Sequence, residues 1–209
     1  MQYATNSRRL ILQEAYKLFL TNNVEKGTIE ELERASQKVR GTIFYHFKNK
    51  QDIFKSVVDE LFFPSLAIPV DIQDIINTTS LRQFVELYQS PEKRAINQIK
   101  EIYHVDQPEM SYYNFVFQAY KYYEDFDKKI NNVMSLDIEI WKTVIDNAHK
   151  SKELICNHST EELVILFTSF VTGLPLKEKY FHSLNLDYSQ SLTKLYSFIQ
   201  RRVQSNCIE

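Results

Sequence analysis

The chain of 209 residues is long enough for one large domain or two small ones, and no apolar run approaches the ~20 residues that a membrane-spanning helix requires. Three glycines and five prolines are few, and because sheets need many turns, this composition predicts an all-α protein. The net charge of −2 divides into +4 over residues 1–50 and −6 over the remainder. This distribution suits a basic N-terminal segment that binds a polyanion, attached to an acidic remainder of the chain. Cys156 and Cys207 are far apart and no signal peptide is evident, so we expect reduced thiols, a cytoplasmic location and no membrane partner.

The first helix is predicted over residues 7–22. Its apolar stripe consists of Ile11, Ala15, Leu18 and Phe19. Arg8 and Arg9 lie near its start, where the positive end of the helix dipole favours anions. These two arginines are therefore either solvated side chains of the first turn or phosphate contacts.

Two short helices follow, over residues 29–36 and 40–46. Thr28 and Glu31 form a capping box, in which each side chain satisfies the other residue's free backbone N–H. The residues predicted to face inward are Ile29, Leu32, Ala35, Ile43 and Phe47. The residues left to face outward are Arg40, Thr42, His46, Lys48 and Lys50. Two helices of this length joined by a few residues, the second one basic, are the sequence form of a helix-turn-helix DNA reader.

A fourth, linking helix is predicted over residues 50–63. Asn49 and Asp52 cap its start in the same way, and Pro64 is expected to end it. Its apolar positions are Ile53, Val57 and Leu61. Pro64 and Pro69 then bracket a short connector, which is the best candidate for a domain boundary.

The rest of the chain is predicted to be helical, for a total of about nine helices. The expected spans are 80–89, a helix opened by Pro91, and then 106–125, 127–152, 160–181 and 188–204. Residues 163–171 are apolar nearly all round, so they must be covered on more than one side. The last two helices form either a core hairpin or one half of a four-helix bundle between two chains.

Arg40 is the best candidate for reading a base, because arginine can hydrogen-bond both acceptors of guanine in the major groove; the alternative is a phosphate contact. Gly41 either lets the backbone approach the duplex or only eases helix packing, and Thr42 meets a thymine methyl or a phosphate. Phosphate contacts are assigned to Tyr45, His46, Lys48 and Lys50. The complete predicted DNA-binding set is Thr28, Lys38, Arg40, Gly41, Thr42, Tyr45, His46, Lys48 and Lys50, with Gln37 also near the DNA.

Aromatic residues are abundant in the second part of the chain and have two interpretations. They form a core, or some of them line a cavity for an apolar or aromatic effector. The candidate ligand-binding residues are Tyr88, Tyr103, Tyr113, Phe117, Tyr120 and Trp141. Because no metal-ligand spacing, nucleophile–base pair or glycine-rich phosphate loop stands out, we predict no metal, no catalytic residue and no cofactor.

Residues 10–61 resemble the DNA-binding domain of the TetR family of bacterial transcriptional regulators. The matching positions are Leu18-Phe19, Thr28, Leu32, Ala35, Gly41-Thr42-Ile43-Phe44, His46-Phe47, Asn49-Lys50 and Ile53. The resemblance implies a helix-turn-helix domain over 1–50, a ligand-binding and dimerisation domain over 51–209, and dimer helices at about 160–181 and 188–204. It further implies a homodimeric, ligand-responsive repressor of a palindromic operator in double-stranded DNA.

Three departures from the family pattern raise an alternative function. The turn 36–39 lacks the family's usual glycine and the third helix lacks a side-chain cap at Val39. Phe44 replaces the usual tyrosine, and Pro175 is expected to kink or end the penultimate helix. The alternative is a helical ligand-binding or interaction protein of the same fold that has lost sequence-specific DNA binding.

Overall fold

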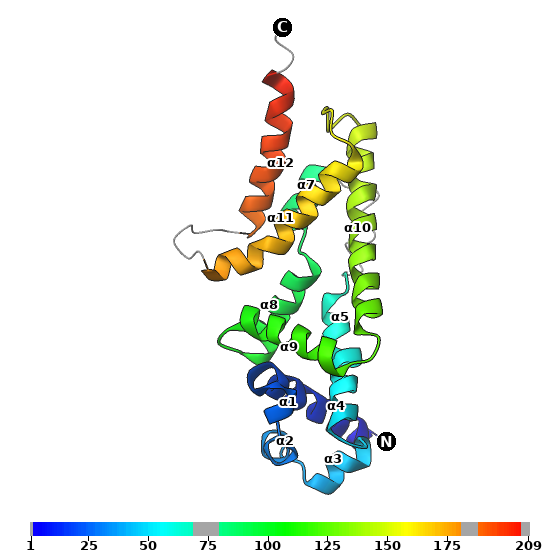
Figure 1. The fold of residues 1–209 in the computed structure, drawn as a ribbon, viewed down its shortest axis with the longest axis vertical. Helices are drawn as coiled ribbons and strands as arrows, with labels where there is room; N and C mark the ends of the chain where they lie inside the picture. The colour runs from blue at the N-terminus through cyan, green and yellow to red at the C-terminus, as the bar shows by residue number, and fades with distance from the viewer. Residues whose placement is uncertain (1, 69–79, 181–187, 206–209) are drawn as a thin grey trace. The chain divides into compact units, whose positions relative to one another are not determined.

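The computed structural model describes residues 2–68, 80–180 and 188–205, and within these ranges every regular element is a helix (Figure 1). The predicted all-α fold is therefore confirmed. The chain divides into two compact units. The first unit comprises Met1–Ala67 and Arg94–Asn131, and the second unit comprises Ile68–Lys93 and Asn132–Glu209.

The first unit begins with α1 and ends within α10. Its elements are α1 (Gln2–Lys26), α2 (Ile29–Ser36), α3 (Arg40–His46), α4 (Lys50–Val57), the π-helical turn η1 (Val58–Phe62), α5 (Phe63–Leu66), most of α8 (Pro91–Tyr103), α9 (Pro108–Tyr122) and the start of α10 (Phe126–Lys150). The predicted spans 29–36 and 40–46 are confirmed. The domain boundary predicted between residues 50 and 51 stays a prediction. In the packing, residues 51–67 belong to the same compact unit as α1–α3.

Local hydrogen bonds explain why α2 and α4 begin where they do. The Thr28 hydroxyl accepts from the Glu31 backbone N–H at 3.1 Å, and the Glu31 carboxylate accepts from the Thr28 backbone N–H at 2.9 Å. Asn49 Oδ1 likewise accepts from the Asp52 N–H at 2.8 Å. Each bond satisfies a first-turn N–H that has no partner within its helix.

The buried side of α2 differs from the prediction: of the three residues expected to face inward, only Leu32 is buried, and Ile29 is half-buried. Ala35 is exposed, whereas Ser36 is buried and its hydroxyl donates to the Leu32 carbonyl at 2.6 Å. A serine hydroxyl can be buried at low cost when it bonds the carbonyl four residues earlier. Helical spacing predicted that Leu32 is buried, but it did not predict the burial of Ser36, whose hydroxyl is bonded within the helix.

Pro64 does not end the linking helix, which corrects the predicted stop. After Val57 the chain makes a π turn, in which the Phe63 N–H donates to the Val58 carbonyl, and α5 then continues to Leu66. The extra residue in the π turn shifts the buried face, so that Phe62 is fully buried while Leu61 is only half-buried. Pro64 is tolerated because it lies in the first turn of α5, where its missing N–H costs little.

Phe115 of α9 is the centre of the first unit's aromatic core. Its ring contacts Tyr16 of α1, Phe54 of α4 and Phe62 of η1, with centroid distances of 4.9, 5.5 and 5.2 Å. All four side chains are almost completely buried. The first helix α1, the linking helix α4 and the π turn η1 are thus packed on α9 in a single core.

The second unit is built around Trp141 of α10. Its helices are α7 (Leu81–Leu87), the remainder of α10, α11 (Thr160–Tyr180) and α12 (Tyr188–Ser205). The indole stacks on Phe167 of α11 at 4.9 Å and meets the Phe84 and Tyr88 rings edge-on at 4.8 and 4.7 Å. Side-chain caps are again observed: the hydroxyls of Ser80 and Ser159 accept from the backbone N–H groups three residues later.

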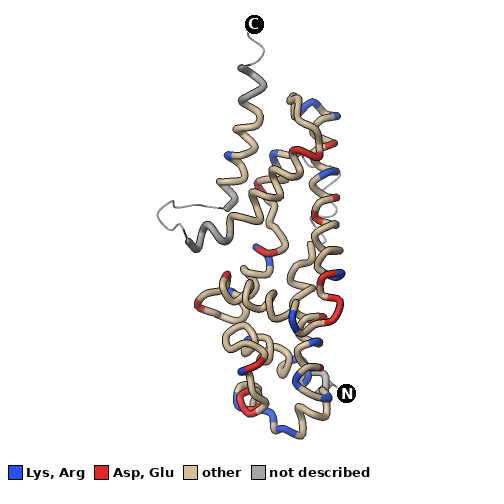
Figure 2. The backbone as a smooth tube through the Cα atoms, viewed as in Figure 1, with Lys and Arg blue, Asp and Glu red and all other residues tan. Residues whose placement is uncertain are grey.

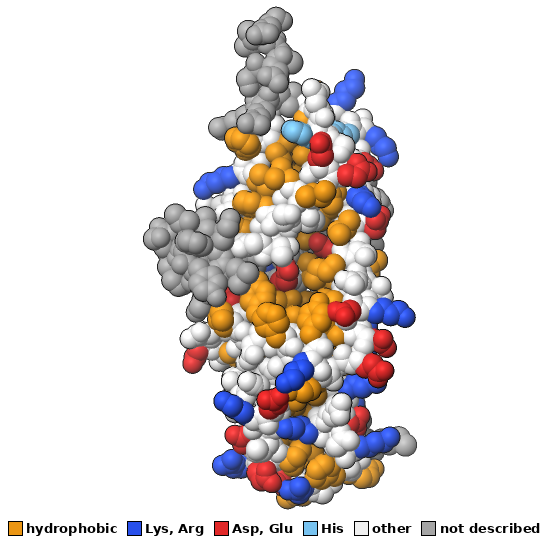
Figure 3. Space-filling view, viewed as in Figure 1, with side chains coloured by type: hydrophobic (Ala, Val, Ile, Leu, Met, Phe, Trp, Pro, Cys, Tyr) orange, Lys and Arg blue, Asp and Glu red, His pale blue; other side chains and the backbone are white. Residues whose placement is uncertain are grey.

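The last two helices were predicted at about 160–181 and 188–204. Pro175 does not end the penultimate helix, since α11 continues through it to Tyr180; the alternative, a kink at Pro175, stays a prediction. Large apolar side chains reach the surface (Figure 3), and among the side chains described on the last two helices these are Ile165, Leu166 and Phe198. Pro69, Asp187 and Cys207 lie outside the described residues. No helix in the described part of the chain is long and apolar enough to cross a membrane.

Candidate DNA-binding surface

The third helix, α3, is held by two buried side chains and leaves its other faces open. Ile43 and Phe47 are buried, and the guanidinium of Arg8 lies 5.2 Å from the centre of the Phe47 ring. Arg8 also forms a double hydrogen bond with the Glu60 carboxylate, at 2.6 and 2.5 Å, which raises the pKa of Arg8. Arg8 therefore has a structural partner, which sequence analysis did not anticipate.

The turn between α2 and α3 keeps a left-handed residue without a glycine. Gln37 adopts φ 54° and ψ 32°, a conformation that costs a residue with a side chain roughly 1–2 kcal/mol. Val39 precedes α3 without a side-chain cap, as predicted, and is 70% exposed. The chain thus makes the turn at a local cost that other packing must offset.

Arg40 projects from the start of α3 and has partners on two sides. Its Nη1 donates to Oε1 of Glu30 on α2 at 3.1 Å, and its Cζ lies 5.5 Å from the centre of the Phe44 ring. Both ion-pair side chains remain exposed, Arg40 by 58% and Glu30 by 64%. Sequence analysis missed Glu30, because residues ten apart meet only once the turn has folded.

Gly41 faces open space. A Cβ built at this position meets no other atom within 4 Å, so close packing inside the chain does not explain the glycine. Thr42 is half-buried, whereas the Tyr45 ring is 79% exposed. The outer face of α3 therefore presents a glycine and a phenol that the core does not need, beside a half-buried hydroxyl.

The remaining residues predicted to contact DNA differ in how far their side chains are exposed and in whether they already have partners within the chain. Lys48 is exposed, and the half-buried His46 ring packs between Tyr45 and Phe47. Lys50 is not free: its ammonium donates to the Glu25 and Gly27 carbonyls at 3.3 Å each, at the C-terminal end of α1. Such a cation stabilises carbonyls that have no helical partner. Lys50 is therefore first a structural residue.

Charge at this surface is mixed. Figure 2 shows acidic and basic residues together on α2, whereas α3 carries basic charge only at its start, at Arg40. The glutamates on α2 are Glu30, Glu31 and Glu33, and the basic residues nearby are Arg34, Lys38, Arg40 and Lys48. The pKa of Glu30 is lowered, first by a hydrogen bond to its own backbone and then by Arg40, so this carboxylate stays charged near neutral pH.

Polar contacts from α9 hold the C-terminal end of α1, and we call them the anchoring contacts. At Asn23 the α1 backbone leaves helical geometry, with φ 66°. The Gln118 side chain bonds the groups that this break exposes: Nε2 donates to the Phe19 carbonyl at 3.3 Å, and Oε1 accepts from the Val24 N–H. Lys121 further donates to the Glu25 carboxylate at 2.8 Å.

The candidate ligand-binding residues are divided between the two units. Tyr103, Tyr113, Phe117 and Tyr120 belong to the first unit, whereas Tyr88 and Trp141 belong to the second. Tyr103 and Trp141 are core residues, and burial raises the pKa of Tyr103 to about 12. Phe117 and Tyr120 are exposed on α9. Spacing cannot separate a cavity wall from a core or a surface.

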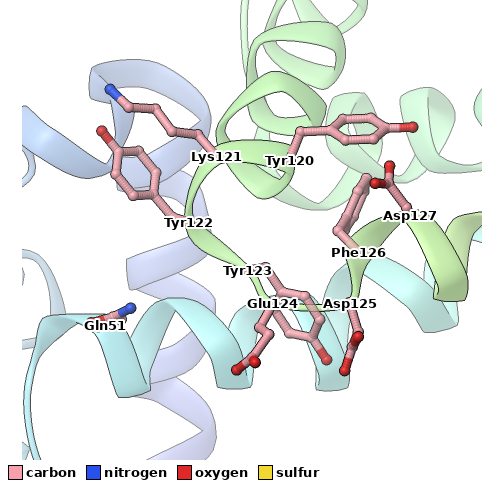
Figure 4. Close-up of a pocket in the computed structure, with 9 residues that line it drawn as sticks. All are labelled: Gln51, Tyr120, Lys121, Tyr122, Tyr123, Glu124, Asp125, Phe126 and Asp127. Atoms are coloured by element: carbon pink, nitrogen blue, oxygen red, sulfur yellow. The ribbon is translucent and has the colours of Figure 1, made fainter.

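Two hollows touch this set of residues. Tyr120 borders a surface hollow of about 460 Å³ at the turn between α9 and α10, where Figure 4 shows its ring on the same side as Phe126 and Asp127, away from Glu124 and Asp125. Tyr88 borders a cleft of about 500 Å³ in the second unit, together with Met134, Asp137, Ile138 and Val171. The second-unit cleft is the more apolar of the two and offers the better place for an organic ligand.

Within the described ranges, no three His, Cys, Asp or Glu side chains lie close enough together to hold a metal ion. The prediction of no catalytic residue and no cofactor stays a prediction.

Comparison with known proteins points to one family. Residues 11–57 match the family described as bacterial regulatory proteins, tetR family. The HTH-type transcriptional repressor AcnR of Corynebacterium glutamicum is 41% identical over 56 residues, and the repressor BepR of Brucella suis is 36% identical over 61. These matches cover 27% and 29% of this chain, and only 30% and 29% of the respective relatives.

The likeness in fold extends much further along the chain. The structure of NalD, the secondary repressor of the MexAB-OprM multidrug efflux pump in Pseudomonas aeruginosa, aligns with a TM-score of 0.64 over 96% of this chain and 97% of its own. Its sequence identity is only 16%, so this match speaks for the fold alone.

Proposed function

Because this chain belongs to the tetR family of bacterial regulatory proteins, we propose that it is a cytoplasmic DNA-binding transcriptional regulator without enzymatic activity. It acts as a ligand-responsive repressor, binding a palindromic operator as a homodimer. Each protomer places α3 in a major groove, so that the two-fold axis of the dimer coincides with that of the operator.

The observation that carries this proposal is the open face of α3. Gly41 has no packing reason to be a glycine, and a backbone without a side chain can come close to the duplex. Arg40 and Tyr45 extend from the same short helix, one suited to a base edge and the other to a phosphate. Lys38, Thr42, His46 and Lys48 supply further polar and basic groups around them.

Thr28 and Lys50 also belong to the proposed interface, each with a second role. The Thr28 hydroxyl caps α2, and the Lys50 ammonium binds the end of α1. Each can still approach a phosphate, because a hydroxyl has two acceptor lone pairs and one donor, and an ammonium has three donors. Substitution of either residue is expected to change stability as well as binding.

Dimerisation is assigned to α11 and α12. Ile165, Leu166 and Phe198 are exposed apolar side chains on these two helices, and burying them against a second copy removes their surface from water. The effector is an apolar or aromatic small molecule, with the second-unit cleft bordered by Tyr88 as its site. Its binding shifts the repressor between two states only insofar as its affinity for the two states differs.

The test is a selection of bound duplexes from a randomised pool with the purified full chain, followed by Arg40→Ala. We expect one roughly palindromic sequence to be enriched, bound as a dimer in analytical ultracentrifugation, and bound at least tenfold more weakly by Arg40→Ala with an unchanged circular dichroism spectrum. A monomer, or a pool that shows no enrichment even at low salt, contradicts the proposal.

The uncapped start of α3 at Val39 favours one alternative, a protein of the same fold that no longer reads DNA sequence. For that protein, the selection yields no enriched sequence, and Arg40→Ala changes only weak, salt-sensitive binding. The same experiment therefore separates the two functions.

A further inference from the structure

The contact between Glu30 and Arg40 constrains how the arginine can bind. A guanidinium is planar and carries its five N–H donors in a fixed fork. Since Nη1 donates to Glu30 at 3.1 Å, the Nε and Nη2 edge, which makes no hydrogen bond among the described residues, stays open. The Phe44 ring, 5.5 Å from Cζ, supports the group from another side.

We propose that Glu30 is a positioning residue for base reading: it holds the Arg40 guanidinium so that its open edge meets a guanine, and it keeps Arg40 away from phosphate. This inference rests on the proposed DNA-binding function. It also gives the Phe44 ring a role as an aromatic face beside the cation, for which no hydroxyl is needed.

The geometry supports reading over simple stabilisation. An exposed ion pair contributes little to the stability of a folded protein, and both side chains here are more than half exposed. A carboxylate on a DNA-facing surface repels phosphate, so it weakens binding to any duplex. That repulsion is useful only where a correct base compensates for it, since the two open donors then match the O6 and N7 acceptors of guanine.

The test compares three glutamine or alanine variants of the full chain on duplexes selected from a randomised pool by the wild type. Arg40→Ala identifies the operator position at which guanine preference depends on Arg40. At that position we expect the wild type to prefer guanine at least tenfold, and Glu30→Gln to prefer it less than threefold. Glu30→Gln should also bind a scrambled duplex more tightly, with a salt dependence steeper by about one counterion.

Glu33→Gln is the matched control, because it removes the same charge one turn further along α2 from a side chain that does not bond Arg40. We expect it to keep the full guanine preference. The inference is overturned if Glu30→Gln keeps that preference, or if Glu33→Gln loses as much. If the wild type enriches no sequence, both the proposed function and this inference fail. If it does enrich a sequence, the two glutamate variants test the inference alone.

Discussion

Two regions of the first unit, the exposed face of α3 and the buried side of α9, have side chains with opposite roles. On the α3 surface, Arg40, Gly41 and Tyr45 are exposed and contribute almost nothing to the core. On the α9 side, Phe115 fills the core and Gln118 satisfies backbone groups of α1. Residues suited to recognition and residues responsible for folding are therefore separate, although both lie on helices of a single compact unit.

The physical reason is that a polar group already bonded within the protein is not fully available to bind a partner. A donor already bonded inside the protein must lose that bond before it binds a partner, which costs free energy. Lys50 shows the intermediate case, since it is bonded to α1 and was also predicted to contact DNA. The contrast between the two regions can be tested by substitutions that affect only one of them.

The largest expected effect is on the α9 side. Phe115→Ala removes a fully buried ring that contacts three aromatic neighbours, and we expect a loss of about 3–5 kcal/mol in the free energy of unfolding. Phe117→Ala is the matched control, since this ring lies two residues along the same helix and is 71% exposed. Chemical denaturation measures both. A similar loss for the two variants would contradict the assignment of Phe115 to the core.

Gly41→Ala tests the α3 surface. The added methyl group meets no atom of the chain and favours the helix, so stability should rise by up to about 1 kcal/mol. The same methyl group obstructs approach to DNA, and operator affinity should fall by roughly tenfold, or about 1.4 kcal/mol.

Gly173→Ala adds the same methyl group on α11, where a Cβ also meets no other atom within 4 Å, and is the control for the gain in stability alone. The operator affinity of Gly41→Ala is measured by a fluorescence anisotropy titration. Undiminished affinity in Gly41→Ala would show that the backbone does not come close to the duplex there.

Gln37→Gly tests whether the turn between α2 and α3 carries strain. The residue has φ 54°, which glycine adopts freely, although glycine also gains entropy in the unfolded chain. We expect a net stabilisation of about 0.5–1 kcal/mol in thermal unfolding, with operator affinity unchanged. Gln37→Ala, which cannot relieve the strain, should not stabilise; if it does, the side chain rather than the backbone is responsible.

The smallest effect concerns pH. Hydrogen bonds from Lys121 and then Tyr122 lower the pKa of Glu25 below its ordinary 4.5. A lowered folded-state pKa stabilises the protein above the ordinary pKa, and this stabilisation is lost as the pH falls through the lowered value. We therefore expect the melting temperature to fall slightly below about pH 4.5, and Glu25→Gln to flatten that part of the profile. An unchanged profile in Glu25→Gln would remove this ion pair from the anchoring contacts.

Much of the helix-turn-helix could be read directly from the residues. Thr28, Glu31 and Asn49 fixed the starts of α2 and α4, because a cap acts through bonds to residues three positions away. The buried Leu32, Ile43 and Phe47 followed from helical spacing. Proline failed as a signal for the end of a helix. The π turn at Val58–Phe62 leads into α5, which contains Pro64, and α11 continues through Pro175.

The sequence by itself determined the all-α class, the caps and the buried Ile43 and Phe47, since these depend on composition and on neighbours within one or two turns. Only the tertiary structure decided the partners of the polar groups: Glu30 for Arg40, the end of α1 for Lys50, and Gln118 for the break at Asn23. It also separated the aromatic residues into core, surface and cleft. These outcomes depend on contacts between distant segments, and the spacing of residues along one helix does not encode them.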